Sequence, residues 1–193
     1  RQMCIRDSHY FVDFGLAPNE KYEVDECPFG KLVDTEEMGP VPEGWKIGKL
    51  SDVAEILMGQ SPPSEYYNSE MNGLPFHQGV TNFNERYVTH DTFCSLKLRV
   101  GRAGSILFSV RAPVGRINIT DTDIIIGRGL SAINSTISSN SFLLYALKNI
   151  FSKEDLIGGG TVFNAVTKGE LESVKILIPT KEYLSQYSLS LIH

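Results

Sequence analysis

The hydrophobic and polar positions of the chain change their spacing several times, and each spacing predicts a different element. Residues 45–50 alternate between apolar and polar side chains, which is the two-residue period of a β-strand. Ser51 is a good helix N-cap and Asp52 suits a first turn, so the apolar side chains that follow predict a helix through Leu57 that Gly59 ends. Further strands are predicted by the short apolar runs at 74–79, 105–110 and 124–126.

The C-terminal half adds helices to this strand-rich pattern. Residues 140–151 are apolar on nearly all sides, which predicts a helix that is buried or packed on two faces. Thr167 and Glu170 have the spacing of a capping box, so a short helix begins there and leads into a strand at 174–178. Another helix is predicted to begin at 181. The predicted fold class is α+β, a β-rich domain with a few packed helices.

The N-terminal segment of the chain has a different character. Residues 9–14 are apolar and aromatic, and they resemble the last turns of a helix that Gly15 and Pro18 stop. Residues 19–44 are acidic with Pro and Gly throughout, which predicts a linker or long surface loop. Trp45 is expected in the core, where it starts the domain. Since the chain begins with Arg and not Met, we expect it to be a fragment.

Composition narrows the class of protein. The chain has 193 residues, 41% hydrophobic and 21% charged, which is ordinary for a soluble domain with a proper core. Its three cysteines lie far apart and form no CxxC pair, so the sequence predicts neither a disulfide framework nor a zinc site. No apolar run is long enough to span a bilayer, and a cytoplasmic setting is expected.

Charge is distributed unevenly along the chain. The net charge is −5, but residues 1–45 carry four basic and ten acidic side chains, whereas residues 97–128 carry six basic and two acidic ones. A local basic face is therefore compatible with an acidic total, although solvated surface charge explains the pattern equally well. Within 101–130 the arginines stand in turns rich in Gly and Pro, where a rigid sheet would present them to an anion such as a phosphate backbone.

The sequence contains none of the common catalytic motifs. The Gly-Lys pairs are followed by Leu, so they are not phosphate-binding P-loops, and the run at 158–160 lacks the spacing of a dinucleotide site. The histidines have no metal-ligand spacing, and the sequence contains no GxSxG elbow. We therefore expect no catalytic residue, no metal site and no cofactor.

Several polar residues are candidates for contacts with a nucleic acid. Gln60, Gln78 and Asn164 have amides that can read adenine edges, although such amides are also common loop residues. Arg128 can contact DNA or can pair with Asp121 or Asp123 to fix the turns. Tyr66 and its neighbour Tyr67 can stack on a partner or anchor their Pro-rich loop.

The chain resembles a known family, the specificity subunits of type I restriction–modification systems, and in particular one target recognition domain. The segments that carry the resemblance are VPEGWKIGKLSDVAEI (41–56), LPFHQG (74–79), GSILFSVRAPVGRINI (104–119), IIIGRGLSAI (124–133) and GGTVFNAVTKGELESVKILIP (159–179). HYFVDF at 9–14 is similar to the end of the conserved spacer helix that precedes the second recognition domain.

The resemblance implies a non-catalytic subunit that reads one half of a split double-stranded DNA target. Its expected partners are methyltransferase subunits and a motor-nuclease subunit. Phosphate contacts position such a domain, whereas base contacts specify the target. The expected phosphate-binding residues are Arg102, Arg111, Arg116 and Lys168, and the expected base readers are Gln60, Gln78 and Asn164 in the loops 60–72, 78–90 and 158–168. Tyr66 and Arg128 complete the set of expected DNA-binding residues.

The resemblance also divides the chain. Residues 1–8 are expected to be a non-native end, 9–44 the end of a spacer helix and an acidic linker, 45–180 the recognition domain, and 181–193 the start of the next spacer helix with a non-native end. Two alternatives stay open on the sequence. The domain can belong to a single-chain or two-subunit restriction–methylation enzyme, or it can be a β-rich protein- or sugar-binding module with no DNA function.

Overall fold

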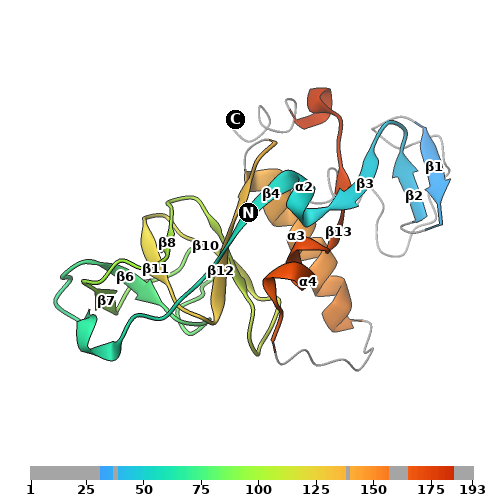
Figure 1. Ribbon diagram of the computed structural model, residues 1–193. Coiled ribbons are helices and arrows are strands. Elements are labelled where there is room, and N and C mark those ends of the chain that lie inside the picture. The colour runs from blue at the N-terminus through green and yellow to red at the C-terminus, as the bar shows by residue number, and fades with distance from the viewer. Residues whose placement is uncertain (1–30, 37–38, 138–139, 157–164, 185–193) are drawn as a thin grey trace.

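The computed structural model describes residues 31–36, 39–137, 140–156 and 165–184 (Figure 1). The predicted helix end at 9–14, the glycine run at 158–160 and Asn164 lie outside these residues. A pair of larger β-sheets packs together in the described region, and helices cover one side of the pair, so the predicted β-rich α+β class is confirmed. None of the helices described is long and apolar enough to cross a membrane.

A four-stranded antiparallel sheet forms the middle of the molecule. Its order is β10 (Ile117–Ile119), β9 (Ile106–Ser109), β12 (Leu130–Ser135) and β4 (Ala54–Met58). Side chains alternate between its two faces, as the two-residue period requires. Ile106, Phe108 and Ile133 belong to the core on the helical side, whereas Leu107 and Ala132 belong to a cluster on the opposite side.

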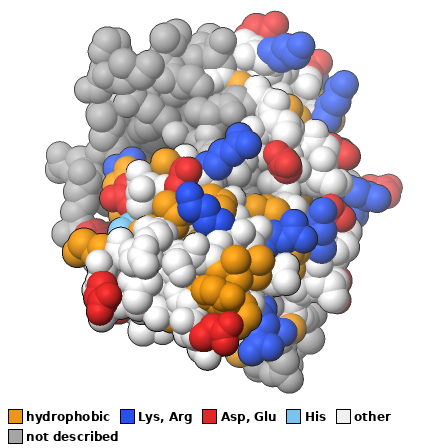
Figure 2. All heavy atoms as spheres, turned by 60° about the vertical axis from the view of Figure 1, so that its left-hand side comes forward, with side chains coloured by type: hydrophobic (Ala, Val, Ile, Leu, Met, Phe, Trp, Pro, Cys, Tyr) orange, Lys and Arg blue, Asp and Glu red, His pale blue; other side chains and the backbone are white. Residues whose placement is uncertain are grey.

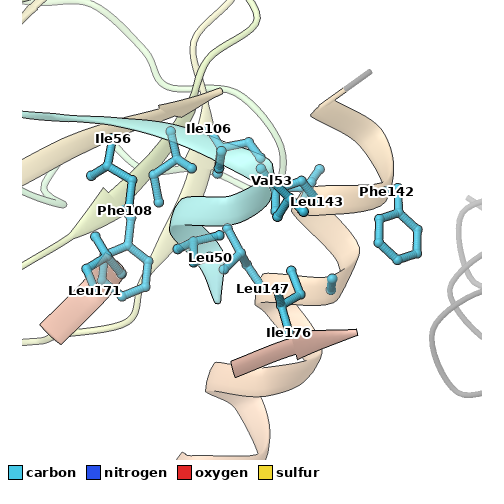
Figure 3. Packing of buried hydrophobic residues seen from close by; sticks show 14 of the residues in the cluster. Leu50, Val53, Ile56, Ile106, Phe108, Phe142, Leu143, Leu147, Leu171 and Ile176 are labelled. Atoms are coloured by element: carbon cyan, nitrogen blue, oxygen red, sulfur yellow. The ribbon is translucent and has the colours of Figure 1, made fainter. Parts of the chain in front are cut away.

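The helical side of this sheet holds the main hydrophobic core. Helix α3 (Asn140–Leu156) contributes Phe142, Leu143 and Leu147 to this core, and Leu143 and Leu147 lie near Val53 and Leu50 of the short helix α2 (Leu50–Val53) (Figure 3). Trp45 is 9% exposed and makes an edge contact with Phe142 at 6.2 Å between ring centroids. The predictions of a buried helix near 140–151 and a buried Trp45 are confirmed.

A second sheet covers the other side, on the left in Figure 1. Its strands are β5 (Tyr67–Asn68), β7 (Phe93–Cys94), β6 (Leu74–His77), β11 (Ile124–Ile126) and β8 (Val100–Gly101), in that order. β11 runs parallel to β6 and antiparallel to β8. Ile124 and Ile126 of β11 face Leu107, Leu130 and Ala132 between the sheets, so the apolar run at 124–126 is buried on both sides.

The C-terminal elements return to the start of the domain. Helix α4 (Lys168–Glu172) begins with the predicted capping box, in which the Thr167 side chain accepts a hydrogen bond from Glu170 N and Glu170 Oε2 accepts one from Thr167 N at 2.8 Å. Thr167 N and Thr167 Oγ1 both donate to Glu170 Oε2, and these two hydrogen bonds lower the pKa of the Glu170 carboxyl. Strand β13 (Lys175–Ile178) then pairs antiparallel with β3 (Lys46–Lys49), which joins the C-terminal elements to the segment that precedes α2.

Two predicted elements are wrong. The helix expected through Leu57 stops at Val53, because the next residues form β4 and pair with β12. Its first turn is capped by Asp52, whose carboxylate accepts from Lys49 N at 2.8 Å, and Ser51 lies inside the helix. The predicted linker contains a hairpin of β1 (Leu32–Thr35) and β2 (Gly39–Pro42), whose turn Gly39 permits with a φ of 72°.

Candidate nucleic-acid interface

Most of the candidate polar residues lie along one edge of the four-stranded sheet, which here means the side where its strands begin or end. Because the strands are antiparallel, the ends of β4 and β9 lie at the same edge as the starts of β10 and β12. The loops that leave and enter there carry exposed arginines and glutamines. We call this surface the arginine edge, and it consists of Gln60, Gln78, Arg111, Arg116 and Arg128.

Three loops meet at the arginine edge with their backbones in close contact. Gln60 N donates to Ile126 O at 2.9 Å, and Gly127 N donates to His77 O at 2.7 Å. A side chain would not fit between them, since a Cβ on Gly59 would lie 2.1 Å from Gly127 O and one on Gly129 would lie 2.2 Å from Gln78 O. The glycines therefore lock the 59–61, 77–79 and 127–129 segments into one rigid unit.

Side chains add a short link across this unit. Ser61 Oγ donates to Gln78 Oε1 at 3.4 Å and accepts from Arg128 N at 3.2 Å. Gln60, Gln78 and Arg128 are exposed, although the backbone beneath them is fixed. Such an arrangement presents amide and guanidinium groups to a partner with little freedom in the main chain to lose on binding.

The turn between β9 and β10 places two further arginines at the same edge. Buried Ser109 donates to Pro113 O at 2.6 Å and accepts from Arg116 N at 2.8 Å, which fixes both ends of the turn, and the Ala112–Pro113 peptide is cis. Arg111 pairs with Ala165 in an isolated β-bridge, so the segment that leads to α4 also reaches this edge. Arg111 and Arg116 are both exposed.

The two carboxylates that could pair with Arg128 make other contacts. Asp121 lies 3.2 Å from His90 Nε2, and Asp123 Oδ1 accepts from Ala103 N at 2.9 Å. Within the described residues neither carboxylate forms an ion pair with Arg128. The structure therefore does not show Arg128 fixing the turns through an ion pair with Asp121 or Asp123. The Arg128 guanidinium is available to an anion.

The face of the molecule that Figure 2 turns toward the viewer is mixed in charge. Figure 2 turns the side of the five-stranded sheet toward the viewer, and there Lys and Arg side chains stand among Asp, Glu and apolar ones. The Lys and Arg side chains therefore do not form one continuous patch on this face. What distinguishes the arginine edge is its rigid backbone and its combination of amides with guanidinium groups.

The structure places the remaining candidates elsewhere. Arg102 lies at the opposite edge of the four-stranded sheet, just before β9. Its carbonyl accepts from Ser105 N, and Gly104 N in the same turn donates to Thr120 O. Lys168 is the first residue of α4 and forms an ion pair with Glu172 at 3.3 Å. Asn164 lies outside the described residues.

The two tyrosines have different roles. Tyr66 ends the short 3₁₀ helix η1 (Ser64–Tyr66) and is 38% exposed. Tyr67 donates its hydroxyl to Pro62 O at 2.7 Å and stacks on Phe76 at 4.5 Å between ring centroids. The loop-anchor interpretation therefore holds for Tyr67, while Tyr66 is exposed enough to contact a partner.

Sequence reasoning missed a chain of ionisable side chains next to the arginine edge. His77 Nε2 lies 2.8 Å from His90 Nδ1, and His90 Nε2 lies 3.2 Å from Asp121 Oδ1. The separation of these residues along the chain matches no metal-ligand or catalytic motif, so no sequence signal points to them. Among the residues that the structure describes, no group of three or more His, Cys, Asp or Glu side chains could hold a metal ion.

The sequence of this domain matches a known protein family. The family described as the type I restriction modification DNA specificity domain matches residues 42–186. The chain belongs to this family. The matched region includes every strand of both large sheets and every residue of the arginine edge.

Curated relatives agree with this assignment. A Methanocaldococcus jannaschii protein named as the MjaX specificity subunit of a type I restriction enzyme is 43% identical over 150 residues, which are 76% of this chain and 35% of that protein. The HindI specificity subunit of a type I restriction enzyme from Haemophilus influenzae is 28% identical over 163 residues, covering 75% of this chain and 34% of that protein. The chain spans about a third of the length of these relatives.

Solved structures have the same fold. The HsdS subunit from Thermoanaerobacter tengcongensis matches with a TM-score of 0.68 and 30% identity, over 99% of this chain and 44% of that one. A chain from a study of complex assembly and conformational transition in the type I R-M system matches with a TM-score of 0.71 and 34% identity, over 97% of this chain and 44% of that chain. The strand-rich architecture is therefore that of known type I specificity subunits.

Proposed function

We propose that this chain recognises one half of a split double-stranded DNA target within a type I restriction–modification complex. The observation that carries the proposal is the arginine edge, where exposed guanidinium and amide groups stand on a backbone locked by close glycine contacts. The family supports the DNA partner, since its description is that of a DNA specificity domain. Methyltransferase and motor-nuclease subunits are the proposed protein partners, and the chain itself is proposed to be non-catalytic.

The residues of the arginine edge divide by chemistry. Arg111 and Arg116 stand in the turn between β9 and β10, and we assign them to phosphate, which a guanidinium binds in any sequence context. Gln60, Gln78 and Arg128 come from the three locked loops and are assigned to base edges, because their bidentate groups can distinguish adenine or guanine in the major groove. Tyr66 and Lys168 are assigned supporting contacts to the sugar-phosphate backbone of the DNA, and Asn164 keeps its expected role as a base reader.

Arg102 is not assigned to phosphate in this proposal. It is exposed, but it lies at the edge of the sheet opposite Arg111 and Arg116. A duplex that contacts the arginine edge therefore does not need Arg102. Its charge and exposure make it a matched control for the two edge arginines.

Replacing Arg111 and Arg116 together by alanine is expected to weaken binding to all duplex sequences alike. The slope of log Kd against log salt should fall by about two units, since each lost phosphate contact removes about one. Titration of labelled duplexes at several salt concentrations measures the slope. Arg102→Ala should leave it nearly unchanged, and a double variant with wild-type slope would contradict the phosphate assignment.

A further inference from the structure

We propose that Asp121, His90 and His77 form a hydrogen-bonded chain that positions Gln78 for base reading. In this role they are specificity-determining residues that touch no DNA themselves. The inference rests on the proposed function, because it concerns the same edge, but the chain of contacts stands on its own geometry.

The three side chains run from the surface to the core. The Asp121 side chain is 60% exposed, that of His90 is 20% exposed, and His77 is buried at 3% exposure. The imidazole rings meet edge-on, with centroids 5.1 Å apart and a nitrogen-to-nitrogen distance of 2.8 Å. That distance requires a hydrogen between the two rings, so one imidazole donates and the other accepts.

This contact closes the base of the loop that carries Gln78. His77 ends β6 and His90 follows thirteen positions later, so the pair joins the two ends of the 78–89 segment. His77 also fixes the arginine edge through its main chain, since His77 O accepts from Gly127 N at 2.7 Å. Gln78 is the next residue, and its Cα lies 2.9 Å from where a Cβ of Gly127 would stand. Contacts that hold His77 in place therefore also hold the backbone at the next residue, Gln78.

The hydrogen bond between the two imidazoles is kept when His90 alone is protonated, but it is lost when both rings are protonated. With both rings neutral, His77 Nε2 donates to His90 Nδ1, and His90 Nε2 donates to the Asp121 carboxylate. With His90 protonated, His90 Nδ1 donates to His77 Nε2, and the bond to Asp121 becomes an ion pair. If His77 is protonated as well, two N–H groups face each other at 2.8 Å and the bond is lost.

The surroundings keep His77 neutral. Burial, and after it the neighbouring His90, lower the pKa of His77 to about 4, although Asp91 acts in the opposite direction. Asp91 and Asp121 are the carboxylates that face the pair, and hydrogen bonds from Asn82 and Thr92 lower the pKa of the Asp91 carboxyl. Because the unfolded pKa is about 6.5, the contribution of neutral His77 is complete above that pH and is lost as the pH falls toward about 4.

The test compares variants of His90 and Asp121 in the full chain with its methyltransferase partner. His90→Ala removes the contact to His77, whereas His90→Asn can restore it, because an Asn amide stands near the position of Nδ1. Discrimination is measured as the Kd ratio between a cognate duplex and one changed at the base pair read by Gln78. The wild-type ratio of about 5- to 150-fold should fall close to 1 in His90→Ala, with the salt slope unchanged, and should recover partly in His90→Asn.

Asp121→Ala provides a second variant that removes only the exposed end of the chain, so it should fold even if His90→Ala does not. We expect it to reduce discrimination less than His90→Ala. In the free chain, ¹⁵N NMR titration of the imidazoles should show His77 neutral down to about pH 4. An ordinary His77 titration near pH 6.5, or full discrimination retained in both His90→Ala and Asp121→Ala, would overturn the inference.

These outcomes separate the inference from the proposed function. DNA binding with unchanged discrimination in the variants would overturn the inference alone. A folded chain that binds no duplex, even with the methyltransferase partner, would overturn the proposed function and with it the positioning role.

Discussion

Replacing Gly59 by alanine is expected to destabilise the chain by about 3 kcal/mol or more and to remove the proposed DNA recognition at the arginine edge. The new Cβ would lie 2.1 Å from Gly127 O and 2.8 Å from Ile126 O. Both neighbours are backbone atoms, so the loops have to move apart. That movement breaks the hydrogen bonds by which Gly59 N reaches Leu130 O and Gln60 N reaches Ile126 O.

Urea unfolding followed by circular dichroism gives the stability change, and duplex titration gives the loss of binding. Gly79→Ala is the matched control, since a Cβ there meets nothing within 4 Å. It should stay within about 0.5 kcal/mol of wild type. If the Gly59→Ala chain kept the wild-type urea midpoint and the wild-type affinity for duplex DNA, the close approach of these loops would not be needed for stability or binding.

Replacing Phe108 by alanine is expected to cost about 3–5 kcal/mol of folding stability. Phe108 has no exposed surface and lies on β9 in the main core, close to Leu50 and Leu171 (Figure 3). Its ring also meets Phe151 of α3 at 4.6 Å between centroids. Truncation leaves a cavity where the sheet, α2, α3 and α4 come together, so several elements lose packing at once.

The same unfolding measurement checks this prediction. Met71→Ala removes a side chain that is 76% exposed, and it should change the free energy of unfolding by less than about 0.5 kcal/mol. A Phe108→Ala chain that is as stable as Met71→Ala would mean that the sheet does not depend on its helical cover.

Local patterns were enough to predict the elements whose cause is local. The capping box at Thr167 and Glu170 predicts the start of α4 because all its hydrogen bonds lie within one turn. The apolar run 124–126 predicts a strand that is buried on both faces. Ile124 belongs to the cluster on one face, and Ile125 belongs to the cluster on the other. The apolar composition of 140–151 likewise predicts a helix that the core surrounds.

Elements decided by distant partners were predicted less well. Residues 54–58 have the apolar spacing of a helix as well as that of a strand, and their pairing with β12 selects the strand. The pairing partner lies far along the sequence, so no window around Ile56 contains the deciding information. The hairpin of β1 and β2 was missed for a similar reason, because its Pro and Gly residues are also typical of a linker.

The candidate site could be predicted in its residue types but not in its arrangement. Arg111, Arg116 and Arg128 stand out in the sequence as arginines in Gly- and Pro-rich turns. Only the strand order shows that they share an edge with Gln60 and Gln78, and that Arg102 lies at the opposite edge. The His77–His90 contact depends on the same topology, so the sequence alone could not have indicated it.

The most direct test of the account is selection from a randomised duplex pool by the folded chain, at moderate salt, alone and with the proposed methyltransferase partner. We expect one short motif to be enriched, and Gln78→Ala to relax a single base position by about 1–3 kcal/mol while the rest of the motif is kept. Enrichment of no motif by a folded chain, both alone and with the partner, would contradict sequence recognition at the arginine edge.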